Sequence, residues 1–234
     1  MKPSSRFWVG GILWALCAPL LMLRAEATLQ KGDRLFFLGD SITVASTSPT
    51  GFVTILDETL DQREPDNTYS FHTVAKGGRG VRFLKSSFPS KVEAANPQVV
   101  VIYIGINDVR LVERNPNDNP EQYRSMLTQL VESAQALPAQ VVICSPAIRG
   151  EKTDGSNPYD ALIDQYANIC REVAIETQAS FINLRSEFMA TLKRINPQND
   201  TEGHLTKDGV HPNAAGNKLI ANALLTLWGY DPIP

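Results

Sequence analysis

Three residues that lie far apart in the sequence have the side chains that nucleophilic acyl transfer requires. Ser41 stands in the sequence Gly-Asp-Ser-Ile, and Asp208 precedes His211 by three residues near the C-terminus. A serine hydroxyl needs a base to accept its proton, and an imidazole needs a carboxylate that fixes its tautomer and stabilises the imidazolium. At this spacing the carboxylate can meet Nδ1 and leave Nε2 free. Our first hypothesis is therefore a nucleophile Ser41, a base His211 and an orienting acid Asp208.

Each of these features also has a simpler explanation, and two other histidines compete for the role of base. A serine in this position often serves a turn or a helix N-cap, and an Asp before a helix often caps it. His72 lies in a strand pattern, and His204 has no Asp three residues before it. We interpret both as structural residues and choose His211.

Two further motifs offer hydrogen-bond donors. Asn107 stands in Gly-Ile-Asn-Asp after an apolar run, where its amide can stabilise a developing oxyanion or can simply close a turn. The run Lys-Gly-Gly-Arg-Gly from Lys76 to Gly80 allows close backbone approach and can present another amide. The same glycines can also cradle a phosphate.

The elements that must position these residues alternate along the chain. Apolar runs rich in β-branched or aromatic residues predict strands at 35–38, 69–74, 99–104, 141–144 and 181–184. Apolar residues spaced by three and four predict helices over 52–60, 123–131, 162–173 and 215–227. The pairs Asn119-Pro120 and Asn157-Pro158 predict two helix starts, each with an Asn cap and a Pro in the first turn.

Alternating strands and helices with apolar central strands predict an α/β fold, in which a parallel sheet lies between two helix layers. Such folds place their sites at the carboxyl ends of the strands. The candidate motifs follow the first three strands or precede the last helix, so we expect them to converge on one edge. We also expect the segment from Leu111 to Tyr123 to wall the acyl or alcohol pocket.

These motifs in this order resemble the SGNH hydrolases, the GDSL lipase and esterase family, from about Arg34 to Leu227. The resemblance implies a flavodoxin-like three-layer α/β/α sandwich with a five-stranded parallel sheet, and serine chemistry without cofactor or metal. It assigns Ser41 as nucleophile and first oxyanion donor, Asn107 as a side-chain donor, His211 as base and Asp208 as its acid.

The resemblance assigns Gly80 as the second backbone donor of the oxyanion hole. Family members usually have Asn five residues before that glycine, whereas this chain has Ala75. Gly78 therefore stays open as an alternative.

The N-terminal 27 residues have the pattern of a cleaved secretory signal. Two basic residues precede an apolar stretch, which is followed by Ala-Glu-Ala. The alternative is an uncleaved membrane anchor. We predict export to the periplasm or the exterior, one domain over residues 28–234, and no stable membrane insertion after cleavage. Cys144 and Cys170 remain in the mature chain, where export permits a disulfide without requiring one.

Charge and composition limit the partners. The 234 residues carry a formal charge of −3, and removing residues 1–27 leaves 19 basic and 24 acidic side chains, a balance of −5. A chain this acidic, without a basic run, is not built to bind nucleic acid. We therefore predict a secreted serine esterase for short acyl or acetyl esters on a small molecule or a carbohydrate. The alternatives are a lysophospholipase or thioesterase of the same fold, and a non-catalytic flavodoxin-like protein that binds an anion. The sequence leaves the oligomeric state open.

Overall fold

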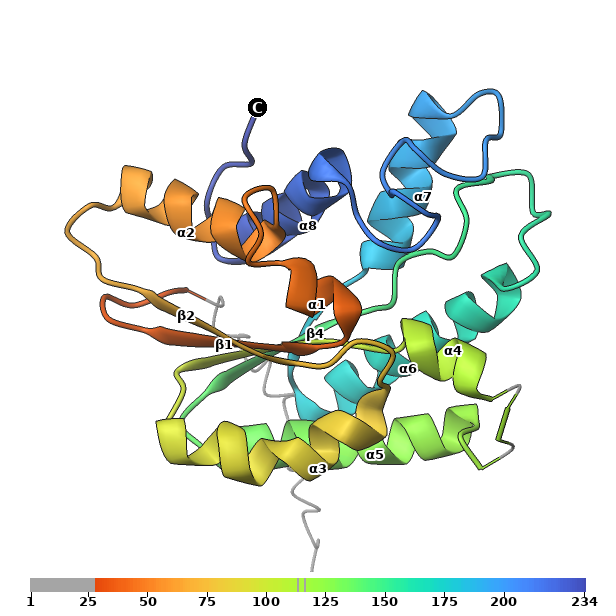
Figure 1. Cartoon of the computed structure of the whole chain (residues 1–234). Coiled ribbons are helices and arrows are strands. Elements are labelled where there is room, and N and C mark those ends of the chain that lie inside the picture. The colour runs from red at the N-terminus through yellow and green to blue at the C-terminus, as the bar shows by residue number, and fades with distance from the viewer. Residues whose placement is uncertain (1–27, 113, 116) are drawn as a thin grey trace, which may run out of the picture.

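A five-stranded parallel sheet forms the centre of the molecule, in the order β2-β1-β3-β4-β5 (Figure 1). The computed structural model describes residues 28–112, 114, 115 and 117–234. The strands are β1 (Arg34–Gly39), β2 (Ser70–Ala75), β3 (Val99–Tyr103), β4 (Gln140–Cys144) and β5 (Ser180–Ile182). The expected parallel sheet and its α/β class are confirmed.

Burial explains which strands lie in the middle. All five residues of β3 are buried, as expected for a strand covered by helices on both faces. The edge strand β2 has only one buried residue, Val74, and His72 on it is exposed and stacks on Phe36 at 4.6 Å. The last strand is shorter than predicted: β5 ends at Ile182, because the Asn183 side chain accepts from the Ser186 amide and caps the next helix.

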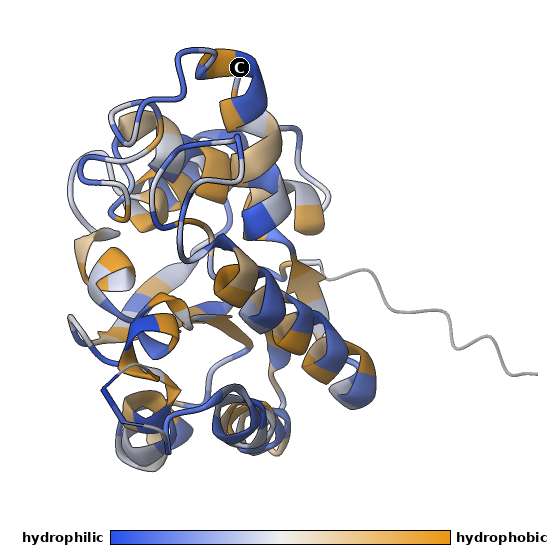
Figure 2. Cartoon of the chain, turned by 90° about the vertical axis from the view of Figure 1, so that its right-hand side faces the viewer, coloured by the Kyte–Doolittle hydropathy of each residue, from blue (hydrophilic) through white to orange (hydrophobic). Residues whose placement is uncertain are grey.

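Helices cover both faces of the sheet. Figure 1 shows α2, α7 and α8 on one side and α3, α5 and α6 on the other. The helices are α1 (Ser41–Ala45), α2 (Phe52–Arg63), α3 (Val81–Lys91), α4 (Ile106–Leu111), α5 (Pro120–Gln135), α6 (Asp160–Thr177), α7 (Leu184–Ile195) and α8 (Ala214–Leu227). Figure 2 shows hydrophobic and hydrophilic residues alternating along these helical ribbons, as amphipathic helices require.

The two Asn-Pro pairs have different outcomes. Asn119 caps α5 as predicted, because its side chain accepts from the Gln122 amide at 2.9 Å. The prediction at Asn157 was wrong, since α6 begins at Asp160. The Asn157 amide is turned inward instead and donates to the Lys152 carbonyl at 2.8 Å. This hydrogen bond closes the loop after β4, and Asn157 does not cap a helix.

The register of the sheet explains why separate motifs meet. Gly39, Ala75, Tyr103 and Cys144 are paired in one row across β1, β2, β3 and β4. Because the strands are parallel, the residues that follow this row all emerge at the same edge. That edge is where the candidate site lies.

Three remaining expectations concern the termini and the thiols. The predicted signal sequence lies outside the described residues. Within the described chain, no helix combines the length and apolarity needed to cross a membrane. Cys144 and Cys170 are free, buried thiols, and Cys170 Sγ lies 3.1 Å from the Tyr123 hydroxyl.

Candidate active site

A tight turn between β1 and α1 presents Ser41 as the first residue of α1. The Asp40 side chain accepts from the Ile42 amide at 2.9 Å and caps the helix. Gly39 is required before it, since a Cβ there would lie 2.0 Å from Thr43 Oγ1 and 2.7 Å from the Tyr103 carbonyl oxygen. The sequence Gly-Asp-Ser thus places the hydroxyl at the carboxyl edge.

Ser41, His211 and Asp208 form one hydrogen-bonded chain. His211 Nε2 lies 2.8 Å from Ser41 Oγ, and Nδ1 lies 2.7 Å from Asp208 Oδ2. Burial alone would raise the pKa of Asp208, but hydrogen bonds from the backbone and ring of His211 and from the Val210 amide hold that pKa below its usual value. An ionised Asp208 is the form that fixes the imidazole tautomer.

The other histidines lie elsewhere. His204 Nε2 is 3.2 Å from Asp200 Oδ2, so it has an aspartate four residues earlier that the sequence argument did not consider. His72 stacks on Phe36 on the edge strand. Both contacts fit the structural interpretation of these residues.

The loop that carries Asp208 and His211 is held by a residue that sequence reasoning missed. Glu151 follows β4, and its carboxylate is fully buried. Its Oε1 accepts from the Leu205 amide at 2.8 Å and from the Thr206 amide and hydroxyl at 2.5 and 2.6 Å, while Oε2 accepts from the His204 amide at 2.8 Å. A buried charge needs such partners. No motif in the sequence predicts this contact, because more than fifty residues separate Glu151 from its partners.

The anchored segment continues directly into the reactive pair. The Thr206 hydroxyl accepts from the Gly209 amide at 3.0 Å, and the Gly209 carbonyl accepts from the Gly150 amide at 2.7 Å. Asp208 Oδ1 accepts from the His211 amide at 2.8 Å, which closes the turn between the acid and the base. Glu151 is therefore connected to the ring of His211 through hydrogen bonds to Thr206 and Gly209 and through the backbone that joins Gly209 to Asp208.

Asn107 lies on α4, just past β3, and faces the serine turn. Its Nδ2 donates to Asp40 Oδ2 at 3.1 Å and to the Arg79 carbonyl at 3.2 Å. An amide nitrogen carries two hydrogens, so these two acceptors engage both of them. An oxyanion at this position has to share or replace one of these bonds, and the bond to Arg79 is the more exposed of the two.

The geometry distinguishes the two candidate glycines. Gly80 is buried and caps α3, and a Cβ there would lie 2.3 Å from Asp108 Oδ1. Gly78 is exposed, with φ of 71° and no atom within 4 Å of such a Cβ. The loop also touches the nucleophile, since a Cβ on Gly77 would lie 3.6 Å from Ser41 Cβ. Only Gly80, of the two candidates, is packed tightly against the site.

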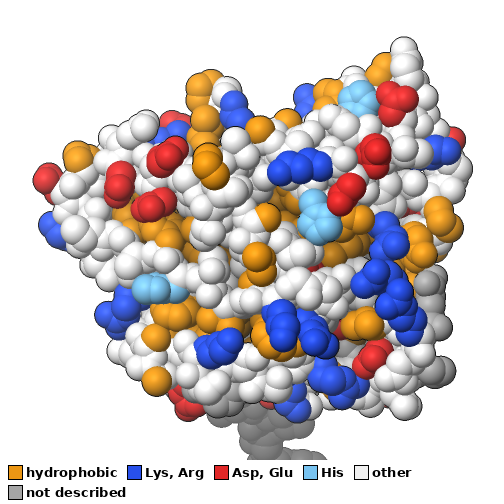
Figure 3. Space-filling model, viewed as in Figure 1, with side chains coloured by type: hydrophobic (Ala, Val, Ile, Leu, Met, Phe, Trp, Pro, Cys, Tyr) orange, Lys and Arg blue, Asp and Glu red, His pale blue; other side chains and the backbone are white. Residues whose placement is uncertain are grey.

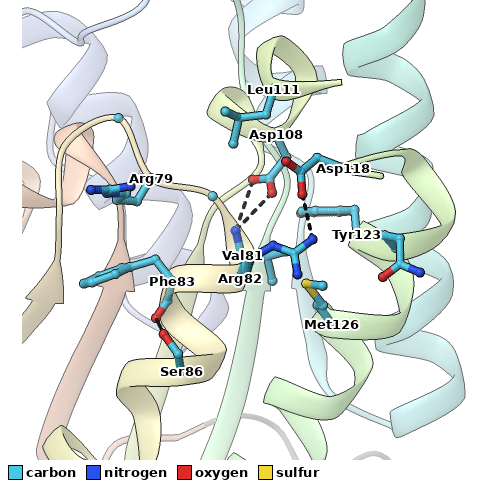
Figure 4. Close-up of a pocket in the computed structure, with 13 residues that line it drawn as sticks. Arg79, Val81, Arg82, Phe83, Ser86, Asp108, Leu111, Asp118, Tyr123 and Met126 are labelled. Atoms are coloured by element: carbon cyan, nitrogen blue, oxygen red, sulfur yellow. Dashed lines mark hydrogen bonds and ion pairs between the residues drawn. The ribbon is translucent and has the colours of Figure 1, made fainter. Parts of the chain in front are cut away.

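Two buried carboxyls support this side of the site. Burial raises the pKa of Asp40 to about 6 and that of Asp108 to about 7. Asp108 accepts from the Val81 amide at 3.0 and 3.3 Å through its two oxygens and so fixes the start of α3 beside Gly80 (Figure 4). The residues next to the serine are therefore arranged around two carboxyls whose protonated forms are favoured by burial.

A cavity of about 360 Å³ lies beside Gly80 and between α3 and α5. Figure 4 shows Phe83, Leu111, Tyr123 and Met126 around it and the Arg82–Asp118 ion pair at one side. The expected segment does line this cavity, but Ser41 and His211 do not. The described residues contain no group of three or more His, Cys, Asp or Glu side chains that could hold a metal.

Comparisons with known proteins agree with the resemblance seen in the sequence. The model of the GDSL-like Lipase/Acylhydrolase family matches residues 37–219. An acetylxylan esterase of Geobacillus stearothermophilus is 30% identical over 219 residues, which cover 86% of this chain and 95% of that protein. The mouse isoamyl acetate-hydrolyzing esterase 1 homolog is 26% identical over 205 residues, covering 80% of this chain and 78% of the mouse protein.

Solved structures of acetylxylan esterases are similar throughout. AlAXEase superposes with a TM-score of 0.79 at 31% identity, covering 82% of this chain and 98% of its own. The Geobacillus stearothermophilus acetylxylan esterase superposes with a TM-score of 0.77 at 26% identity, covering 88% of this chain and 99% of that protein. Its variants with a serine, an aspartate or a histidine replaced by alanine are described as catalytic mutants.

Proposed function

Because this chain belongs to the GDSL-like lipase/acylhydrolase family and is an ester-hydrolysing serine hydrolase, we propose that it removes acetyl groups from carbohydrates through an acyl-enzyme on Ser41. The observation that carries this proposal is the chain of two short contacts, 2.8 Å from His211 to Ser41 and 2.7 Å from His211 to Asp208. A serine with its base, and a base with its acid, are the geometry that acyl transfer requires.

The reaction proceeds in two steps. In the first, Ser41 Oγ attacks the ester carbonyl while His211 Nε2 accepts the hydroxyl proton. The tetrahedral intermediate collapses, the proton passes from Nε2 to the departing alkoxide, and the acyl-enzyme remains. In the second, His211 takes a proton from water, the hydroxide attacks the acyl carbonyl, and Ser41 leaves with that proton. Asp208 stays ionised and stabilises the imidazolium in both steps.

The oxyanion of each intermediate needs hydrogen-bond donors beside Ser41. We assign them to the backbone amides of Ser41 and Gly80 and to the side-chain amide of Asn107. The close packing of Gly80 against Asp108 supports Gly80 over Gly78. On binding, the oxyanion takes the place of the Arg79 carbonyl at Asn107, because that bond is the more exposed one.

The names of the relatives support an acetyl ester as substrate. Two of them are acetylxylan esterases, and the third is named for the hydrolysis of isoamyl acetate. Acetate is common to these names, and the alcohol differs. A carbohydrate alcohol is favoured because the acetylxylan esterases match with higher identity and coverage than the mouse protein.

The test combines labelling with a substrate panel. A fluorophosphonate should label the wild type on the peptide that contains Ser41, as seen by mass spectrometry, and should not label Ser41→Ala. Acetate release from acetylated xylo-oligosaccharides should exceed hydrolysis of octanoate, lysophospholipid and thioester substrates at equal concentration. Labelling of a different residue would refute the nucleophile, and a preference for lysophospholipid or thioester would refute the substrate.

We further propose that residues 1–27 are a cleaved signal, that residues 28–234 form one exported domain, and that the mature chain stays out of the membrane. An exported enzyme would meet extracellular acetylated carbohydrate directly. N-terminal sequencing of the protein recovered from outside the cytoplasm should begin at residue 28. Recovery of the intact N-terminus in the membrane fraction would instead support the anchor.

A further inference from the structure

Five basic side chains that form no ion pair with the described residues lie on segments next to the candidate active site, in a chain whose overall charge is negative. We name them the cationic rim: Lys76, Arg79, Arg110, Arg149 and Lys207. Lys76, Arg79 and Lys207 are exposed, and Arg110 and Arg149 are partly buried. Figure 3 shows Lys and Arg side chains gathered on the face that also displays a histidine beside an acidic side chain (Figure 3). Arg82 is not included, because it pairs with Asp118 at 2.7 Å.

The rim residues come from four segments that adjoin the site, and the serine turn itself carries no cation. Lys76 and Arg79 flank Gly77 and Gly78, and a Cβ on Gly77 would lie 3.6 Å from Ser41 Cβ. Arg110 is one helical turn beyond Asn107 on α4. Arg149 precedes Gly150, whose amide donates to the loop of the base at Gly209. Lys207 directly precedes Asp208. The five charges thus come from four separate segments, each of which also carries or adjoins a residue of the candidate site.

Ion pairs with the described carboxylates do not neutralise the rim. Among the described residues, no carboxylate forms an ion pair with any of the five side chains, although other arginines of the chain do form such pairs. Arg110 Nε is buried and has no hydrogen-bond partner. Arg149 lies over the Tyr159 ring at 4.4 Å and Lys76 over the Phe83 ring at 6.0 Å, so aromatic faces rather than acids hold them.

The nearest acids offset only part of these charges. Asp208 is ionised and offsets one of the five cations. Asp40 and Asp108 are buried beneath the surface, and their raised pKa values keep part of each population neutral near pH 6 to 7. A surface concavity lined by one sign of charge raises the local concentration of the opposite sign and accelerates its association.

We propose that the cationic rim selects acetylated carbohydrates that carry carboxylate groups, so that the preferred substrate is an anionic polysaccharide or oligosaccharide. This inference rests on the proposed function and specifies its substrate class. Guanidinium groups suit this task because they bind carboxylates through paired hydrogen bonds. The rim acts on binding and association, and the hydrolytic chemistry at Ser41 is the same for neutral esters.

The experiment compares two substrates that differ only in charge. Acetylated polygalacturonate and the same polymer with its carboxylates converted to amides are supplied at equal acetyl concentration, and acetate release is measured. At about 20 mM salt we expect kcat/KM to be roughly tenfold higher or more for the charged polymer. At about 500 mM salt the ratio should fall towards one, because the Debye length shortens to a few ångström.

A charge-matched pair of variants isolates the rim. Lys76→Gln/Arg149→Gln/Lys207→Gln should lower the preference at low salt at least about fivefold. Lys31→Gln/Arg171→Gln/Lys193→Gln changes the net charge equally at exposed positions away from the site and should retain the preference. Hydrolysis of p-nitrophenyl acetate should stay within about twofold of wild type in both variants, because neither touches a reacting group.

Three outcomes would overturn the inference. They are equal rates on the two polymers, a preference that persists in 500 mM salt, and an equal loss of preference in both triple variants. Each of these leaves hydrolysis of p-nitrophenyl acetate intact. Absence of Ser41-dependent hydrolysis of p-nitrophenyl acetate would instead refute the proposed function itself, so the two failures are distinguishable.

Discussion

The two halves of the candidate site are built by different means. Ser41 and Asn107 lie in the first turns of the short helices α1 and α4, which follow β1 and β3 closely, beside buried carboxyls. Asp208 and His211 stand on a loop outside the sheet, with side chains 54% and 40% exposed. The strand register positions the first half. The second half depends on the buried Glu151, whose carboxylate accepts hydrogen bonds from backbone amides just before Asp208 in the sequence.

The comparison shows two electrostatic solutions at one edge of a sheet. On the side of the nucleophile, burial raises the pKa values of Asp40 and Asp108 and so favours their protonated forms. On the side of the base, Asp208 is stabilised in its ionised form by the hydrogen bonds that it accepts. Hydrogen-bond donors stabilise the ionised form of an exposed carboxyl such as Asp208. Burial at the sheet edge instead favours the protonated forms of Asp40 and Asp108. Substitutions in the two halves should therefore fail in different ways.

The largest effect is expected on the side of the nucleophile. Ser41→Ala should leave a folded protein whose esterase activity is lowered by at least roughly 10³-fold, because no other group is placed to form the acyl-enzyme. The assay is kcat/KM on p-nitrophenyl acetate, with circular dichroism to establish folding. Turnover close to that of wild type would remove Ser41 from the mechanism.

Asn107→Ala should come next, with a loss of roughly 10² to 10³ in kcat and little change in KM. The donor matters most when the oxyanion forms, and the ground-state carbonyl needs it less. The substitution also removes the hydrogen bond to Asp40, so the pH profile of kcat should be recorded alongside. A loss confined to KM would assign Asn107 to substrate binding instead.

Asn107→Asp provides a second test of the same donor. It keeps the shape and would be tolerated if Asn107 only closed a turn. In the oxyanion role it should be at least as damaging as Asn107→Ala, because it removes the donor and places a second carboxyl beside Asp40. An active Asn107→Asp enzyme would contradict the oxyanion assignment.

The side of the base should show a smaller effect through Glu151. Glu151→Gln places an amide group among backbone donors and loosens the loop, so kcat should fall roughly 10- to 100-fold at nearly constant KM on p-nitrophenyl acetate. Glu151→Asp keeps the charge and should recover part of the lost kcat. Thr206→Val removes a single hydroxyl from the same network and should act in the same direction, more weakly.

A purely structural role for Glu151 makes a different prediction. In that case Glu151→Gln and Thr206→Val would lower the melting temperature while the folded fraction kept its full kcat. Measuring kcat per folded molecule, with the folded fraction taken from circular dichroism at the assay temperature, separates the two. Unchanged kcat in folded Thr206→Val and Glu151→Gln would show that the loop needs no anchor to position His211.

The same contrast explains what the sequence could predict. Ser41, Asn107 and the strands before them are local signals, since an apolar run ending in a polar motif is visible in a short stretch of sequence. The pairing of Asp208 with His211 is also local, because three residues separate them. Glu151 escaped detection because its partners lie more than fifty residues away, and a single glutamate after a strand has no recognisable pattern.

The two errors at element boundaries have a common physical cause. Asn157-Pro158 has the composition of a helix start, but the Asn157 amide donates to the carbonyls of Lys152 and Gly150 in the preceding loop. The fifth strand was predicted to end two residues too late, because the Asn183 cap competes with the apolar pattern through Leu184. In both cases the hydrogen-bond partner of an Asn side chain decides between two local structures, and the sequence does not reveal that partner.

The smallest effect on the reaction, and the sharpest test of the electrostatic contrast, is expected for Asp108→Asn. Asn keeps an oxygen that can accept from the Val81 amide, so kcat should stay within about threefold of wild type. Because burial raises the pKa of Asp108 from 3.8 to about 7, the folded state holds a proton that the unfolded state releases in this range. The free energy of unfolding of the wild type therefore falls as pH rises from about 4 to 7.

The Asn side chain does not titrate, so Asp108→Asn removes this contribution. Its stability relative to wild type, from urea unfolding at several pH values, should increase by about 1 kcal/mol per pH unit between pH 4 and 7. Asp154→Asn is the control, because hydrogen bonds from Ser156 lower the pKa of that exposed carboxyl from 3.8. Its pH dependence has the opposite sign and lies mainly below about pH 4, so the difference from wild type should be nearly constant between about pH 5 and 7. A constant difference between Asp108→Asn and wild type across this range would show that Asp108 is ionised as readily as a surface carboxyl. The two halves of the site would then not differ in the way that their burial implies.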